Sequence, residues 1–219
     1  MPMPTRGADP ARYDALWRHA RRIGGVCMVI APALLLAAEL LRIRFPYPVP
    51  QQLAAYRSHP AVMTASYSLS TVGLIALLPA FVTLAVLIGR TGPGWGVAAG
   101  AVATIGLLVN AFYEGWSHLA FTLVDALGPE AATRVVADTY ASFSVMYPIT
   151  FIDNLGWILL AVGAYLSRTL GWFRALCLAS MAAHVSGVLK GGTVAGIIEV
   201  VALGIALVPL GVRVVRSPS

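Results

Sequence analysis

Residues 62–89 read VMTASYSLSTVGLIALLPAFVTLAVLIG, a stretch that contains no charged side chain. A helix needs about 20 apolar residues to cross the roughly 30 Å hydrocarbon core of a bilayer, so this stretch is long enough to span one. Further apolar stretches that reach or approach this length lie at residues 23–41, 95–123, 141–166, 172–189 and 193–212. The sequence therefore predicts an all-α fold, a polytopic membrane helical bundle of about six transmembrane helices.

The composition agrees with a surface that faces lipid. Of the 219 residues, 58% are hydrophobic and only 11% are charged, and the mean hydropathy is +0.80. A soluble domain carries about 25% charged residues because its surface faces water. A chain of this length holds one bundle, so we expect a single transmembrane domain at residues 23–212, preceded by a basic tail at residues 1–22 and followed by a short tail at residues 213–219.

The net charge of +6 would also suit a protein that binds nucleic acid. The arginines stand instead at the ends of the apolar stretches and in short loops, as topology signals do, so no nucleic-acid partner is expected. With the amino terminus inside, the inner segments hold ten of the 15 Arg and Lys residues and the outer segments hold five. This bias predicts that both termini are cytosolic, and the expected location is the cytoplasmic membrane of a bacterium.

Two longer loops, residues 42–60 and 124–140, are expected on the outer side, and each favours a short helix. In the first loop a run of prolines precedes QQLAAYRSHP. In the second, Pro129 stands where the first turn of a helix accepts proline. Such helices either connect spans along the membrane surface or cap a cavity.

Four carboxylates lie within the predicted spans: Glu39, Glu114, Asp153 and Glu199. Each costs roughly 2.5–3.5 kcal/mol at the centre of a bilayer, so we expect all four to face the interior of the bundle, at similar depths. Arg and Lys are absent from the span interiors, and we expect no cation beside these acids. Burial without a counter-ion favours the neutral carboxylic acid, which is a proton donor. Alternatively, the acids serve as hydrogen-bonding links between helices.

The stretch NAFYEGWSH at residues 110–118 is the densest in polar and aromatic residues. Asn110, Glu114 and His118 follow one another at a spacing of four, which places them on one helical face. Aromatic rings stabilise a nearby cation, although an interfacial aromatic belt is the alternative reading. His118 and His184 would also suit a haem, but two histidines are a weak signal. The candidate substrate-binding residues are Asn110, Phe112, Tyr113, Trp116, His118, Tyr67, Tyr147, Phe151, Trp157 and His184.

The segment Asn110-Ala-Phe-Tyr-Glu114 resembles the Asn-x-aromatic-aromatic-Glu stretch of the small integral-membrane terpene cyclases of fungal meroterpenoid and actinobacterial indole-terpenoid pathways. The likeness extends to chain size, helical character and a second acid on a later span. Tyr113 stands where the fungal members typically carry Trp. The resemblance implies a metal-independent cyclase in which Glu114 corresponds to the first essential acid and either Asp153 or Glu199 to the second.

Two functions therefore stay open. The leading hypothesis is a membrane-bound, protonation-initiated terpenoid cyclase that acts on a lipophilic prenylated substrate, with Glu114, Asp153, Glu199 and Glu39 as candidate catalytic residues. The alternative is a small proton-coupled carrier or lipid-binding membrane protein in which the same carboxylates relay protons. The sequence contains no DDxxD-type aspartate pair that would hold Mg²⁺ on a diphosphate, and no metal or other cofactor is expected.

Overall fold

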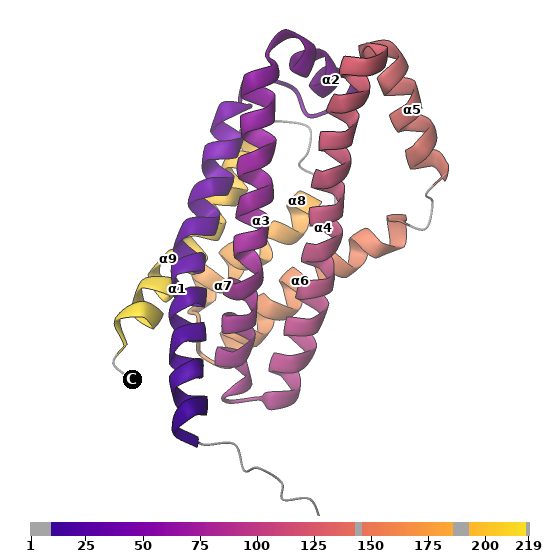
Figure 1. Ribbon diagram of the computed structural model, residues 1–219. Coiled ribbons are helices and arrows are strands. Elements are labelled where there is room, and N and C mark those ends of the chain that lie inside the picture. Colours follow the sequence, from indigo (N-terminus) through magenta and orange to yellow (C-terminus); the bar gives the residue numbers. More distant parts are fainter. Residues whose placement is uncertain (1–9, 143–145, 186–192, 218–219) are drawn as a thin grey trace, which may run out of the picture.

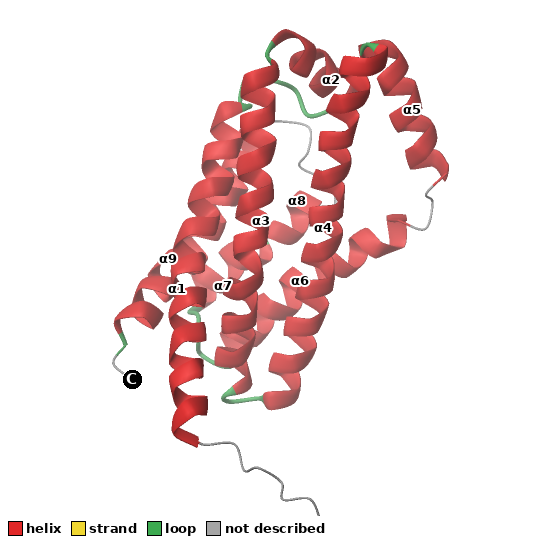
Figure 2. Ribbon diagram, in the orientation of Figure 1, coloured by secondary structure: helices red, strands yellow, loops and turns green. Residues whose placement is uncertain are grey.

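The computed structural model describes residues 10–142, 146–185 and 193–217, and within them every regular element is a helix (Figure 2). The predicted all-α fold is therefore confirmed. The helices are α1 (Pro10–Leu41), α2 (Val49–Ser58), α3 (Pro60–Gly89), α4 (Pro93–Leu127), α5 (Pro129–Ser142), α6 (Met146–Leu166), α7 (Trp172–Ala179), α8 (Met181–Val185) and α9 (Thr193–Arg216).

Four helical segments in the described part of the chain are long and apolar enough to cross a membrane. They are Trp17–Leu41, Pro60–Gly89, Pro93–Leu127 and Val194–Arg216. The other two predicted spans correspond to shorter apolar helices, Phe151–Leu166 and Trp172–Ala183. The count of six membrane crossings thus stays a prediction, while the four long helices stand on their length and composition.

The helices form a closed ring. α1 packs against α3, α3 against α4, α4 against α6, α6 against α7, and α7 against α9, which returns to α1 (Figure 1). The centre of the ring is apolar where Leu77, Phe81, Trp157, Leu160 and Leu203 meet, and each of these side chains is at most 2% exposed. In a bilayer, close van der Waals packing of these large side chains holds the helices together.

Close approach between α4 and α6 depends on Gly106. A Cβ atom added there would overlap the backbone and side chain of Asp153. Small residues at helix interfaces let backbones come close together, and here the close approach places the Asp153 carboxylate directly beside α4.

The two short helices predicted in the longer loops are present as α2 and α5, which cover one end of the bundle (Figure 1). α5 begins at Pro129, as the proline position predicted. A second apolar cluster lies beneath the two helices and includes Leu53, Met63, Phe121 and Val136. The end of the bundle that holds most of the carboxylates is therefore covered by folded chain.

Candidate functional site

Glu39 lies near the end of α1 and is only 4% exposed. Arg42, three residues further on, forms a buried ion pair with it, and Nε of Arg42 is 3.3 Å from Oε2 of Glu39. The hydroxyl of Tyr47 donates a hydrogen bond to the same Oε2. The expectation that no cation lies beside the acids is therefore wrong. Arg42 stands just beyond α1, and the spacing of three residues brings its side chain back to the Glu39 carboxylate.

Arg42 also helps to hold α2, which covers this end of the bundle, in place. Its guanidinium carbon is 5.1 Å from the ring centroid of Tyr47 and 5.3 Å from that of Tyr67, within the range of a cation–π interaction. The Tyr67 hydroxyl donates to Oε1 of Gln52 at 3.1 Å, and the Gln52 amide donates to the carbonyl of Pro46. The start of α2 is thus tied to α3 and to the loop that follows α1.

The protonation states of Arg42 and Tyr47, in the loop after α1, follow from their surroundings. Burial alone would lower the pKa of Arg42, but its hydrogen bond and charge interaction with Glu39 outweigh burial and raise that pKa above its ordinary value. Burial, as the largest cause, raises the pKa of Tyr47 well above its ordinary value. At neutral pH, Arg42 therefore remains a cation and Tyr47 remains a neutral hydrogen-bond donor.

Glu114 lies on α4 and faces α3. Its Oε1 accepts a hydrogen bond from the hydroxyl of Ser70 at 3.0 Å. Its Oε2 is buried and has no hydrogen-bond partner among the residues that the structure describes. Arg42, His118 and Glu39 interact with the carboxyl group electrostatically. Glu114 and the Glu39–Arg42 pair therefore belong to one polar cluster.

The residues predicted to share one face of α4 bind different partners. Asn110 donates from Nδ2 to Oδ2 of Asp153 at 2.6 Å and so holds the acid of α6. His118 has its Nε2 3.5 Å from the hydroxyl oxygen of Thr71. Ser70 thus hydrogen-bonds Glu114, whereas Asn110 hydrogen-bonds Asp153.

All four predicted acids are turned inward to a large degree. Asp153 is 1% exposed and Glu199 is 3% exposed, while Glu114 is half-buried with an enclosed Oε2. α9 brings Glu199 towards Glu39, because Gly196, one turn before Glu199, packs on the Glu39 carboxylate. The expectation that these residues face the bundle interior is confirmed for Glu39, Asp153 and Glu199.

The candidate aromatic residues separate into three groups. Tyr67 belongs to the polar cluster, with its ring edge-on to His118 at 6.3 Å, and Tyr113 and Trp116 are half-buried on α4. Phe112 and Phe151 are 54% and 69% exposed and point away from the acids. Trp157 packs edge-on to Phe81, at 4.7 Å between ring centroids, in the apolar core. The side chains of Tyr147 and His184 lie outside the described residues.

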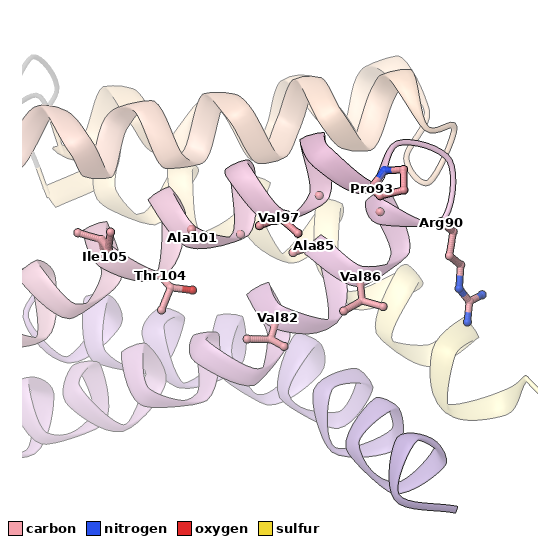
Figure 3. Close-up of a pocket in the computed structure, with 12 residues that line it drawn as sticks. Val82, Ala85, Val86, Arg90, Pro93, Val97, Ala101, Thr104 and Ile105 are labelled. Carbon is pink, nitrogen blue, oxygen red and sulfur yellow. The ribbon is translucent and has the colours of Figure 1, made fainter. Parts of the chain in front are cut away.

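An open groove of about 720 Å³ runs along α3 and α4 near the turn that joins them (Figure 3). Its lining is almost wholly apolar and includes Val82, Val97 and Ile105, with Arg90 at its end. It contains none of the four acids. In a bilayer such a surface faces hydrocarbon, so we do not assign this groove to the carboxylate site.

Sequence reasoning missed Arg42, Tyr47 and Gln52, and it did not identify Ser70 as the partner of Glu114. The spacing of three between Glu39 and Arg42 is a signal that could have revealed the ion pair. Ser70 is one of several hydroxyls in the first half of α3, and its meeting with Glu114 depends on how α3 and α4 are aligned. Within the described side chains, no group of three His, Cys, Asp or Glu residues is placed to hold a metal ion.

Comparisons of the chain with protein-family models, with curated proteins and with solved structures give no match. A proposal about function therefore depends on the chemistry of the buried cluster.

Proposed function

We propose that this protein is a membrane-embedded enzyme that cyclises a lipophilic prenylated substrate by protonation, with Glu114 as the proton donor. The observation that carries this proposal is the arrangement of the Glu114 carboxyl group, which is held by Ser70 through Oε1 while Oε2 is enclosed without a partner among the described residues. A general acid needs a fixed carboxyl group with one oxygen available to the substrate, in a site from which water is excluded.

The balance of charge supports a neutral Glu114. Among the described residues, Arg42 is the arginine near both Glu39 and Glu114, and it forms its ion pair with Glu39. One cation compensates one carboxylate, and two neighbouring carboxylates in a buried site do not both ionise readily. Glu114 is then the member of the pair that keeps its proton.

The reaction begins when Glu114 transfers its proton to an alkene carbon or an epoxide oxygen of the substrate. The resulting carbocation is attacked by a second double bond, which forms the new ring. Loss of a proton from the cyclised cation to a carboxylate ends the sequence, so substrate and product are isomers.

The arginines support the proposed orientation. The start of α1, the α3–α4 turn, the α6–α7 turn and the end of α9 lie at one end of the bundle (Figure 1). Arginines are frequent in these segments. We call this the arginine end, which holds Arg18, Arg21, Arg22, Arg90, Arg168, Arg174, Arg213 and Arg216. Positive residues favour the cytosolic side, so this end faces the cytosol, in a bacterial cytoplasmic membrane.

A proton-coupled carrier is the second candidate, and one observation favours it. Asn110 binds Asp153 and Ser70 binds Glu114, and Glu114 lies one turn further along α4 than Asn110. Acids at successive depths suit the stepwise movement of a proton.

Glu114→Gln tests the proposal. The substitution keeps the size of the side chain and removes its acidic proton, so the protein should fold while cyclisation of a farnesylated indole, followed by mass spectrometry, falls by at least 10²–10⁴. Glu130→Gln, at an exposed position of α5, is the matched control and should remain active. If wild-type protein cyclises no prenylated substrate but moves protons across liposome membranes, and Glu114→Gln stops that movement, the carrier replaces the enzyme.

A further inference from the structure

Three arginines at the arginine end surround one pocket of about 380 Å³. Arg168 and Arg174 come from the turn after α6 and from the first turn of α7, whereas Arg213 comes from the last turn of α9. The fold thus brings together charges from two segments that are far apart in the sequence. The pocket is lined by Arg168, Arg174, Arg213, Thr169, Trp172 and Phe173, together with Gly171.

The backbone at Arg168 is held in an unfavourable conformation. Its φ is 56°, in the left-handed region, which is sterically unfavourable for a residue with a side chain. Glycine or asparagine usually takes this position after a helix. The turn is fixed by hydrogen bonds from the amide of Arg168 to the carbonyl of Tyr165 at 3.0 Å and from the amide of Leu170 to that of Ala164 at 2.9 Å. An arginine at this position therefore reduces stability, and its charge projects from a well-defined turn.

The pocket lacks a counter-ion from the described chain. No acidic residue lines it, and the described residues include no ion pair at Arg168, Arg174 or Arg213. The nearest acids along α6 and α9 are Asp153 and Glu199, 15 and 14 residues away, which is about 20 Å along a helix. Three cations that lie close together without a carboxylate favour an anion from outside the chain.

We propose that this pocket binds the phosphate group of an anionic ligand, with a phospholipid headgroup at the membrane surface as its main source. Arginine is suited to phosphate because its planar guanidinium donates two parallel hydrogen bonds to phosphate oxygens. Thr169 adds a hydroxyl at the same pocket. Trp172 and Phe173, which are 68% and 51% exposed, extend from the rim as aromatic residues do at the headgroup level of a bilayer.

A topology signal alone explains less than this arrangement. Arginines that only determine orientation need to lie near the cytosolic end, but they need neither a common pocket nor a left-handed backbone position. The proposed site lies at the opposite end of the bundle from α2 and does not depend on the proposed activity of Glu114.

The test uses purified protein in detergent and in nanodiscs. Ligand binding is measured by native mass spectrometry and thermal stability by thermal unfolding. Both are compared for phosphatidylglycerol, phosphatidylcholine and the soluble ester glycerol 3-phosphate. We expect phosphatidylglycerol to bind in preference to phosphatidylcholine, and Arg213→Ala and Arg174→Ala each to weaken binding about tenfold or more. Arg216→Ala, which removes the same charge from the same helix outside the pocket, should bind as the wild type does.

Arg168→Gly separates binding from folding. Glycine accepts the left-handed backbone, so this variant should be at least as stable as the wild type and yet bind phosphatidylglycerol more weakly. Tight binding of glycerol 3-phosphate without a preference for phosphatidylglycerol would keep the phosphate site and assign it a soluble ligand. Equal losses of binding in Arg216→Ala and Arg213→Ala would overturn the proposal. So would binding of phosphatidylcholine that is as strong as the binding of phosphatidylglycerol and of glycerol 3-phosphate.

Discussion

Arg42 and Glu39 form a buried ion pair across a spacing of three residues, at the point where α1 ends. Removal of one partner leaves the other charge buried and uncompensated, which typically destabilises a protein by about 3–5 kcal/mol. We therefore expect Arg42→Ala to unfold at a much lower temperature in detergent than the wild type. Arg44→Ala, at an exposed position two residues further on, is the control and should change stability little. Equal stability of the two variants would show that the pair contributes nothing.

Ser70 holds Glu114, so Ser70→Ala should affect activity more than folding. The substitution removes one hydrogen bond, worth about 1 kcal/mol, and leaves the Glu114 carboxyl group less firmly placed. We expect turnover of the prenylated substrate to fall roughly tenfold or more with a nearly unchanged melting temperature. Ser68→Ala, on an exposed part of the same helix, should retain full turnover. A drop of the same size in both variants would remove Ser70 from the site.

Gly106 controls the distance between α4 and α6. Gly106→Ala places a methyl group against the Asp153 backbone, so the helices must separate and the hydrogen bond between Asn110 and Asp153 lengthens. Overpacking of this kind typically costs about 1–3 kcal/mol, which thermal unfolding would detect. Gly115→Ala is a matched control on the same helix, because a Cβ atom there meets nothing within 4 Å. A stable Gly106→Ala variant would contradict the close approach.

Tyr56 gives a prediction about pH. Its hydroxyl donates to Oδ2 of Asp125 at 2.7 Å, and this hydrogen bond, as the largest cause, raises the pKa of Tyr56 above its ordinary value of 10.0. A raised pKa means that the bond stabilises the fold at pH values below about 10 and that this contribution is lost as the pH rises through the raised pKa. In a spectrophotometric titration, the signal of Tyr56 is the one that is absent from Tyr56→Phe. This signal should appear at lower pH in Asp125→Asn than in the wild type, because the hydrogen bond that raises the pKa of Tyr56 is weakened. An unchanged titration would show that the bond does not form in solution.

The positions of the helices follow from the sequence because they depend on local properties. A long uncharged stretch such as residues 62–89 forms a helix in a bilayer because a helix satisfies its own backbone hydrogen bonds, and α3 covers it with two further residues at the start. The break between α7 and α8 was not predictable, since residues 172–189 form one apolar stretch in the sequence. Ser180 ends α7, where its backbone amide bonds to the carbonyl of Leu176 and its hydroxyl to that of Cys177.

The residues of the candidate site were predictable by type but not by partner. The insertion cost of a carboxylate is enough to predict that Glu39, Asp153 and Glu199 lie inside the bundle. The choice of Ser70 for Glu114 and of Asn110 for Asp153 depends on the rotation and alignment of neighbouring helices, which no short stretch of sequence encodes. Arg42 lies beyond the apolar stretch, and charge counting along the chain placed it in a loop.

The contact between α1 and α9 has a consequence for biosynthesis. α1 and α9 close the ring, and the side chain of Arg21 reaches the carbonyl of Ser217, 196 positions later in the chain. Because the ribosome makes α9 after α1 and the helices between them, α1 must wait in the membrane with one face unpartnered until α9 has been inserted. The nascent bundle is therefore open on this side during synthesis, and it closes only after translation has reached α9.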